Sequence, residues 1–507
     1  MDKTQEKHQR IVFWLFIIAI ISIPIFGSLE KLPIKLWDES RTAMNAWEMS
    51  KSSNWWVTTF DGQADMWNTK PPFLVWLQAL MIKLIGLRPL ALRLPVALAV
   101  FSTVLILVRF LNKQTGRTLF GGLVALILVT SGGYLCVHVA RTGDFDGLLI
   151  LFIVGYCLSF FLLLSEGKTK YFYWFFTLLA LAVLTKSIAG LLMLPGLGVY
   201  ALSKRKVVFL VKSPAFYWGA LLCSLMIASF YLTREHYNPG YLKAVYENEI
   251  GGRYLKTLEE NNSPFLYYIE QLSKQHFSYW FALAILGSGI SFYEKDTKTG
   301  DIGRFSSYLV LGFLLIISTS QTKLDWYDAP IFPFMAILAG IGVLKLMDQL
   351  KIRAKWGKNN LFNASKILIL IAVFALPYYT VVKREVIEAK GLPEEMYQYA
   401  LSRYIIGNIS RPDSTLEGQI IVDDEYIPHI EFYMKMAQEK GIHITRKYSN
   451  QVKVGDKILS QQTLSEKPNP AGLQFVKTYD YDGVRKYEVE QVDTTGKLVF
   501  GSLCNGG

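Results

Sequence analysis

Residues 11–27 read IVFWLFIIAIISIPIFG, and residues 36–56 read LWDESRTAMNAWEMSKSSNWW. The first stretch is an unbroken apolar run of 17 residues, and no small-residue cleavage site follows it. Because about 20 apolar residues cross the hydrocarbon core of a bilayer, we expect an uncleaved first transmembrane helix at about 11–29. The charged residues of the second stretch then fall where this helix leaves the membrane. Ionised groups at that depth need partners.

The same apolar character recurs along most of the 507-residue chain, which is 51% hydrophobic and has a mean hydropathy of +0.26. Residues 1–383 carry nearly all the long apolar runs, whereas 384–507 are ordinary mixed sequence. The sequence therefore predicts a polytopic α-helical membrane portion followed by one soluble domain. After 11–29, the predicted spans are 93–111, 118–137, 145–165, 171–185, 187–203, 214–233, 278–293, 304–320, 327–347 and 363–382.

The charge of the connecting segments predicts the orientation of these spans. The formal net charge is +12, but residues 384–507 hold 15 Lys/Arg against 18 Asp/Glu, so the positive excess lies in the membrane portion. Alternate connections, beginning with 1–10, together hold 21 Lys/Arg against 7 acids, which places them in the cytoplasm. Eleven crossings then put the C-terminal domain outside the cell membrane. This location of the charge gives no support to a nucleic-acid partner.

The apolar segment 71–87 tests this count, because a further crossing there would move every later basic loop to the outside. We therefore interpret it as a helix lying in the outer interface of the membrane. With that topology, the external segments include the long loops 30–92 and 234–277. Charged residues gather on this side, at the predicted outer ends of helices: Asp38, Glu39, Arg41, Lys70, Asp146, Lys186, Arg253 and Lys323.

Taken singly, most of these residues have an ordinary structural explanation. Asp38 and Asp146 are placed to cap helices, Lys70 to extend along an interfacial helix, and Lys186 and Lys323 to occupy turns. Taken together, two acidic motifs and several cations suit sugar transfer from a polyprenyl phosphate. The departing phosphate needs cations, and the acceptor hydroxyl needs a carboxylate to take its proton.

The motifs WDESRTAMNAWEMSKSSNWWV, NTKPPFLVWLQALMIKLIG and ALRLPVAL resemble the bacterial aminoarabinose and mannose transferases of the GT-C superfamily. In that family an Asp-Glu-x-Arg motif opens the first external loop and a Lys-Pro-Pro motif closes its polar part. A later Asp begins a helix, followed by an LTKG-like turn and a KLxxYxxP-like stretch. The counterparts here are Asp38-Glu39-Ser40-Arg41, Lys70-Pro71-Pro72, Asp146, LTKSIAG with Lys186, and TKLDWYDAP with Lys323 and Tyr327.

The resemblance implies a role for each of these residues. Asp38 is the expected general base of an inverting transfer, with Glu39 beside it and Asp146 as a second carboxylate of the site. Arg41, one helical turn from Asp38, is expected to orient it. The donor phosphate and lipid are expected to contact the residues Lys70, Arg253, Lys323, Tyr327 and Lys186.

The resemblance also implies the partners of the reaction. The donor is a polyprenyl (undecaprenyl) phosphate sugar within the membrane lipid, and the acceptor is a lipid, a glycan or a protein. No cofactor is required. A divalent metal on Asp38, Glu39 and Asp146 is the less favoured alternative. The active site and the C-terminal domain are expected on the periplasmic or external side of the inner (plasma) membrane.

Three departures from the family pattern bear on the sugar and the acceptor rather than on the reaction class. The lysine turn has Lys-Ser in place of Lys-Gly, and the late motif carries the extra acids Asp325 and Asp328. Aminoarabinose transferases are expected to have two more spans than the eleven counted here, so the fold prediction is 11 to 13. A transporter or flippase for a lipid-linked substrate is the alternative. It predicts internal repeats and charges near the bilayer midplane, and the sequence has neither pattern.

The C-terminal segment predicts a small α/β domain. GQIIVDDEYIPHIEFYMK reads as a strand followed by a helix, and GLQFVKTYDYDGVRKYEVE reads as two strands around a Tyr-Asp-Gly turn. Its acidic run, Asp423-Asp424-Glu425, is interpreted as a solvated strand end rather than a binding site.

Overall fold

The protein is described from a computed structural model that covers residues 3–135, 138–252, 263–294, 297–353, 373–388, 398–409, 415–461, 464, 473–481 and 483–491. The chain forms two compact units, which are described separately. The first unit comprises Met1–Leu29, Asn45–Leu84 and Leu90–Ala389. The second comprises Glu30–Met44, Ile85–Pro89 and Lys390–Gly507.

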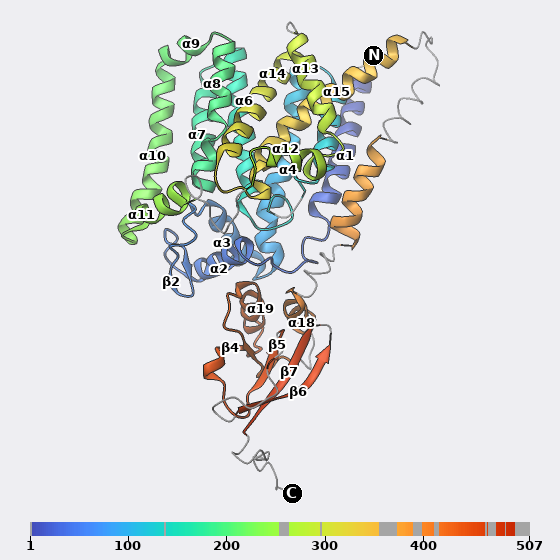
Figure 1. The fold of residues 1–507 in the computed structure, drawn as a ribbon. Helices are drawn as coiled ribbons and strands as arrows, with labels where there is room; N and C mark the ends of the chain where they lie inside the picture. Colours follow the sequence, from blue (N-terminus) through green and yellow to red (C-terminus); the bar gives the residue numbers. More distant parts are fainter. Residues whose placement is uncertain are drawn as a thin grey trace. The chain divides into compact units, whose positions relative to one another are not determined.

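The first unit is a bundle of long apolar helices (Figure 1). Within the described residues, seven helices are long and apolar enough to cross a membrane, since about 20 residues at 1.5 Å each span the hydrocarbon core. Their apolar segments are Lys7–Phe26 in α1, Pro89–Thr115 (α4), Phe145–Glu166 (α6), Lys170–Leu191 (α7 and η1), Pro214–Tyr237 (α10), Lys298–Thr319 (α14) and Asp325–Gln349 (η4 and α15).

Shorter helices occupy the other predicted spans. They are α5 (Thr118–Val129), α8 (Leu194–Ser203) and α13 (Phe281–Tyr293), and residues 373–382 are also helical. The start of the predicted span 363–382 lies outside the described residues. Ten predicted spans thus correspond to helices, which agrees with a polytopic membrane protein.

Burial divides the bundle into a centre and a periphery. Helices α6 and α15 (Phe332–Arg353) are mostly buried, whereas most residues of α1 (Lys3–Phe26) and α10 are partly or fully exposed. A helix that is hydrophobic all round belongs in the core, and exposed apolar side chains on a membrane helix suit contact with lipid. The two buried helices also pack against neighbours, α6 against α7 and α15 against α13.

The segment expected to lie in the interface is α3 (Phe73–Ile85), at one end of the bundle (Figure 1). Its 13 residues are too few to cross a membrane, as the charge pattern required. It begins after Pro71-Pro72, because proline suits the residues leading into a helix and is disfavoured in a helix interior. In the loop before α3, the two-residue strands β1 (Thr59–Phe60) and β2 (Gln63–Ala64) pair antiparallel and form a hairpin.

The remaining elements of the first unit are short. They are α9 (Val207–Lys212), α11 (Tyr241–Val245), the π-helical turns η2 (Tyr246–Gly252), η3 (Leu272–His276) and η5 (Lys383–Glu388), α12 (Tyr267–Gln271) and the 3₁₀ turns η1 (Ser187–Leu191) and η4 (Asp325–Ile331). Of these, η1 and η4 carry residues of the candidate site.

The second unit contains a five-stranded sheet with strand order β4-β3-β5-β7-β6. β3 (Ile420–Val422) is parallel to β4 (Thr445–Lys447) and β5 (Lys457–Ser460). β7 (Val484–Gln491) pairs antiparallel with β5 and with β6 (Leu473–Tyr481). Two helices, α18 (Ala400–Ile409) and α19 (Pro428–Gln438), and the 3₁₀ turn η6 (Ser449–Gln451) complete it. The strand–helix segment and the final hairpin are confirmed.

Candidate active site

A cavity of about 350 Å³ in the first unit combines ionisable side chains with an apolar wall. Residues of α6, α7, η1, α14 and η4 line it, together with the loop before α3. Its polar lining is Lys70, Asp146, Lys186, Glu249, Ser320 and Tyr327, and its apolar lining is Leu149, Ile188, Ala189, Leu192, Phe313, Ile316, Ile317 and Pro330.

Asp146 and Lys186 form a buried ion pair in this cavity. Asp146 lies in the first turn of α6 and Lys186 ends α7. Only a short turn at Gly167 joins these packed helices, so the start of one meets the end of the other. The Lys186 ammonium donates to both carboxylate oxygens of Asp146, at 2.7 and 2.6 Å. Removing one partner of a buried pair costs about 3–5 kcal/mol, so each charge depends on the other.

The turn after Lys186 has a backbone conformation that favours glycine. Ser187 ends α7 with a φ of 47°. The resemblance placed glycine here, and glycine adopts positive φ without the steric penalty of a Cβ. Ser187 is 6% exposed, and its hydroxyl lies 3.2 Å from that of Tyr231. That hydrogen bond offsets part of the conformational cost of having serine at this position.

A network of amide and carboxylate groups positions Lys70. Asp65 accepts hydrogen bonds from the Asn45 side chain and from the backbone N–H of Asn68, both at 3.0 Å. Asn68 in turn donates to Asn45 at 3.0 Å, and its carbonyl oxygen lies 3.5 Å from the Lys70 ammonium. Lys70 is buried, and its ammonium lies 5.3 Å from the centre of the Phe145 ring, one residue before Asp146.

Two residues of the α10–α11 region fix the loop that carries Lys70. Arg234 donates to the backbone carbonyls of Trp56, Thr58 and Asp65 at 3.3–3.4 Å. The Tyr241 hydroxyl donates to the carbonyl of Thr69 at 2.8 Å. These buried contacts, all to the main chain, hold the loop at both ends. The position of Lys70 is therefore set before any substrate binds.

The late motif contributes Tyr327 directly and Lys323 indirectly. Tyr327 lines the cavity, and its ring centre lies 5.9 Å from the Lys186 ammonium. Lys323 is buried beside the cavity and donates to the backbone carbonyl of Ser320 at 2.8 Å. Ser320 follows the last residue of α14, where a cation suits the unpaired carbonyls of a helix end.

Two histidine–aspartate pairs flank the η4 turn, and sequence reasoning missed both. His138 Nδ1 lies 3.1 Å from Asp144, and its ring stacks on Trp326 with the ring centres 3.7 Å apart. His276 Nδ1 lies 2.8 Å from Asp328, one of the extra acids of the late motif. Scattered histidines have no characteristic spacing, so no motif signalled either pair.

The pair at Asp328 raises the pKa of His276 above its ordinary value. Burial alone lowers the pKa, but the hydrogen bond to Asp328 and the charges of Asp328 and Asp325 outweigh it. The folded protein therefore favours the imidazolium form of His276 more than the unfolded chain does. Asp325 also accepts a hydrogen bond from Tyr267.

Glu249 is a further cavity residue that sequence reasoning missed. It lies in η2, four residues before Arg253, which the sequence analysis singled out. The Thr69 hydroxyl donates to its carboxylate at 3.4 Å, which links it to the loop of Lys70. Arg253 itself lies outside the described residues.

The Asp-Glu-x-Arg motif belongs to the second unit, in which α2 (Asp38–Lys51) begins. Glu39 is buried and accepts a hydrogen bond from the backbone of Lys35 at 2.8 Å. The Arg41 guanidinium lies 5.8 Å from the ring centre of Tyr426. Trp37, directly before Asp38, has a φ of 73°, which costs a bulky residue about 1–3 kcal/mol. Such strain persists only where the surroundings hold it.

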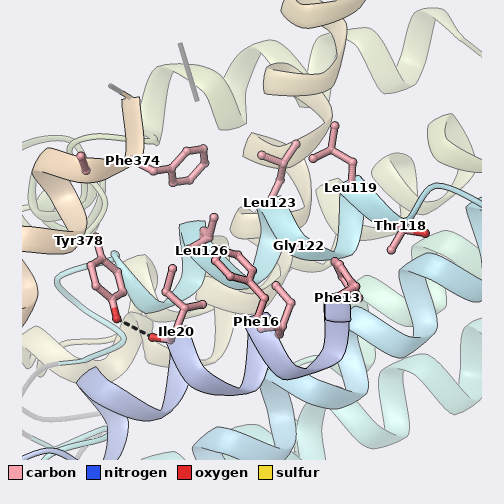
Figure 2. A pocket seen from close by; sticks show the side chains of 12 residues that line it. Phe13, Phe16, Ile20, Thr118, Leu119, Gly122, Leu123, Leu126, Phe374 and Tyr378 are labelled. Atoms are coloured by element: carbon pink, nitrogen blue, oxygen red, sulfur yellow. Dashed lines mark hydrogen bonds between the residues drawn. The ribbon is translucent and has the colours of Figure 1, made fainter. Parts of the chain in front are cut away.

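Another hollow of the first unit, of about 550 Å³, has a different lining (Figure 2). It lies between α1, α5 and residues 373–382, and apolar side chains such as Phe16, Leu119 and Leu123 point into it. Tyr378 contributes a hydroxyl that donates to the carbonyl of Ile20 at 2.7 Å. None of its described lining residues carries a charge.

Comparison with known proteins gives this arrangement a context. Residues 69–232 match the family described as dolichyl-phosphate-mannose-protein mannosyltransferase, a range that includes Lys70, Asp146 and Lys186. The undecaprenyl phosphate-alpha-4-amino-4-deoxy-L-arabinose arabinosyl transferase of Shewanella sediminis is 27% identical over 427 residues, covering 80% of this chain and 73% of that protein. Together these matches support a membrane glycosyltransferase of the GT-C superfamily.

Solved structures share the fold of this chain at low sequence identity. ArnT from Cupriavidus metallidurans, bound to undecaprenyl phosphate, has a TM-score of 0.67 and 15% identity, covering 97% of this chain and 99% of ArnT. The Archaeoglobus fulgidus oligosaccharyltransferase has a TM-score of 0.53 and 13% identity over 89% of this chain and 66% of that one.

A shorter sequence match to the mannosyltransferase-type protein YycA of Bacillus subtilis covers only 24% of that protein.

These findings confirm the predicted class, a polytopic helical glycosyltransferase with a small C-terminal sheet domain. Of the nine predicted site residues, Lys70, Asp146, Lys186 and Tyr327 line one cavity, and Lys323 lies beside it. The roles of all nine remain predictions, and they are developed below as a proposal.

Proposed function

We propose that this protein transfers a sugar from a polyprenyl phosphate to a lipid, glycan or protein acceptor, with the donor phosphate held in the charged cavity. The observation that carries the proposal is the composition of that cavity. Lys70 and Lys186 provide cations beside an apolar wall formed by residues such as Leu192 and Phe313. A polyprenyl-phosphate sugar has two parts that match this lining, an anionic phosphodiester and a long hydrocarbon tail.

The relatives support this donor class. The Shewanella sediminis protein is named for undecaprenyl phosphate aminoarabinose, and the ArnT structure contains undecaprenyl phosphate. The family description of the matched region names dolichyl-phosphate-mannose. All three names describe a sugar or a phosphate carried on a polyprenyl chain. They differ in the sugar, so the donor class is better supported than the sugar.

In the proposed reaction the acceptor hydroxyl oxygen attacks the anomeric carbon as the bond from that carbon to the phosphate oxygen breaks. The configuration inverts, and polyprenyl phosphate leaves with the bonding electrons. Lys70 and Lys186 stabilise the charge that develops on this phosphate, because charge-assisted hydrogen bonds are roughly twice as strong as neutral ones. Asp146 keeps the Lys186 ammonium in place and compensates its charge before the donor arrives.

Asp38 is the proposed base that takes the proton of the acceptor hydroxyl. This assignment rests on the Asp-Glu-x-Arg motif and on the resemblance described above. Glu39 supports the motif through its hydrogen bond to the Lys35 backbone. Arg253 is proposed to contact the donor phosphate, and Lys323 to support Ser320 at the cavity wall. The site and the C-terminal domain are proposed to face the outside, on the basis of the basic cytoplasmic loops.

Release of polyprenyl phosphate tests the proposal. Purified protein in nanodiscs is given a panel of polyprenyl-phosphate sugars with an envelope extract as the acceptor source, and wild type is compared with Asp38→Asn. Asp61→Asn is the matched control, because Asp61 is an exposed carboxylate of the β1–β2 turn with a φ of 53°, which asparagine tolerates.

We expect release by wild type and by Asp61→Asn, and a loss of at least 100-fold in Asp38→Asn with donor binding retained. Equal release by all three proteins would remove Asp38 from the role of base. The absence of release from any donor, by a protein shown to be folded, would contradict the donor class.

A further inference from the structure

Three consecutive backbone N–H groups, at residues 34–36 shortly before the Asp-Glu-x-Arg motif, donate to side chains of the same unit. Ile34 donates to the Tyr433 hydroxyl and Leu36 to the Tyr399 hydroxyl, both at 2.9 Å. Lys35, between them, donates to the Glu39 carboxylate at 2.8 Å. The two tyrosines lie more than 360 residues away in the sequence, in the C-terminal domain. The chain leading into Asp38 is therefore fixed at every residue from 34 to 36.

The tyrosine rings belong to the core of the C-terminal domain. Tyr433 lies on α19 and is fully buried, and Tyr399 directly precedes α18 and is 4% exposed. The Tyr399 ring also packs edge-on against His429 of α19, with the ring centres 5.4 Å apart. Because buried rings are held by close packing, their hydroxyls are rigid points of attachment. The C-terminal domain thus contacts the segment before the motif through buried side chains.

A third tyrosine contacts the motif itself. The Tyr426 ring stacks on Trp37, with centres 5.3 Å apart and planes 25° apart, and its hydroxyl lies 3.5 Å from Arg41 Nη1. Trp37 is the residue with positive φ, and it sets the direction of the chain immediately before Asp38. Strained backbone persists where neighbouring contacts determine it, and here the neighbours come from the C-terminal domain.

We infer that Tyr399 and Tyr433 are positioning residues of the transferase, and that the C-terminal domain is the template that sets the orientation of Asp38. The inference rests on the proposed function, because it takes Asp38 as the base. A catalytic group that moves by about 1 Å can lose about 100-fold in rate. Loss of either hydroxyl leaves a backbone N–H without its acceptor and loosens the segment that aims Asp38.

The test compares Tyr433→Phe and Tyr399→Phe with Tyr487→Phe. Tyr487 is a matched control, because it is buried in the same domain and its hydroxyl also accepts a backbone N–H, that of Leu464, at 3.2 Å. We expect kcat for release of polyprenyl phosphate to fall about 10- to 100-fold in Tyr433→Phe, with the donor KM changed less than about 2-fold. Tyr399→Phe should act in the same direction, and Tyr487→Phe should retain wild-type kcat.

A double-mutant cycle with Asp38→Asn separates positioning from general loss of structure. If Tyr433 acts through Asp38, then Tyr433→Phe should cause no further loss in the Asp38→Asn background. A full additional 10- to 100-fold loss there, or an equal loss in Tyr487→Phe, would overturn the inference while the base role of Asp38 stands. Wild-type protein that releases no polyprenyl phosphate would instead overturn the proposed function, and this inference with it.

Discussion

The first unit contains two hollows, the charged cavity lined by residues of α6 and α7 and an apolar groove lined by residues of α1 and α5. They differ in the charge of their lining, which their sizes do not indicate. The groove is the larger, at about 550 Å³ against about 350 Å³, yet its described lining carries no charge (Figure 2). The cavity combines two lysines and two carboxylates with an apolar lining. A membrane readily fills an apolar groove with lipid, whereas buried charges persist only where partners hold them. The smaller hollow is therefore the candidate for chemistry.

Among the substitutions that test this comparison, Lys186→Met is expected to have the largest effect on stability and on sugar transfer. The substitution leaves the buried Asp146 carboxylate without its cation, so we expect a loss of about 3–5 kcal/mol in stability and of at least 1000-fold in sugar transfer. Thermal unfolding and donor turnover in nanodiscs measure the two effects. The double variant Lys186→Met/Asp146→Asn should regain stability but not activity. Recovery of both would show that the pair is structural.

A smaller effect is expected from Lys70→Gln, which removes the charge and keeps a polar side chain that is one atom shorter. A hydrogen bond to a charged group contributes about 1.5–3 kcal/mol, so donor affinity should fall about 10- to 150-fold. Leu119→Trp, which partly fills the apolar groove, is the matched variant, and it should change donor affinity by less than about 2-fold. The comparison fails if the groove variant has the larger effect.

The pH dependence of stability tests the pairing of His276 with Asp328. The pKa of His276 is raised in the folded protein, so its pairing with Asp328 stabilises the fold fully below the ordinary pKa of about 6.5. That stabilisation is lost as the pH rises through the raised value. Wild type should therefore lose stability between neutral and mildly alkaline pH relative to His276→Gln. Parallel stability curves for the two proteins would contradict the pairing.

The smallest effects are expected at the turn after Lys186. Ser187→Ala keeps the unfavourable positive φ but loses the hydrogen bond to Tyr231, and should cost about 1 kcal/mol. Ser187→Gly loses the same bond but relieves the backbone, so its stability should stay within about 1 kcal/mol of wild type. Thermal unfolding distinguishes the two. A larger cost for glycine than for alanine would contradict the account of this turn.

The sequence predicted the helices and much of the cavity, because both depend on local patterns. Apolar runs located the spans, and the Lys-Pro-Pro, Asp146 and Lys186 motifs supplied residues that line one cavity. It did not predict that Lys186 pairs with Asp146, since that contact depends on how α6 and α7 pack. The departure from the Lys-Gly turn of the family lies at Ser187, where the structure shows a positive φ that the sequence analysis did not predict.

The residues that sequence reasoning missed are those that resemble ordinary core or surface residues. His138 and His276 have no motif spacing, and Glu249 lies in a segment considered for its arginine. Tyr399 and Tyr433 cannot be distinguished by sequence from any buried tyrosine, because only their hydroxyl contacts with residues 34–36 give them a role. Long-range contacts of this kind follow from the tertiary fold alone.

The most direct test of the central claim is photocrosslinking with a polyprenyl phosphate that carries a diazirine on an isoprene unit close to the phosphate. The protein is irradiated in nanodiscs, and the labelled peptides are mapped by mass spectrometry. We predict labelling along the apolar wall of the charged cavity, at residues 188–192 and 313–317, and its loss in Lys70→Gln. Labelling confined to the apolar groove, at residues 119–126 and 374–378, would contradict the assignment of the donor site.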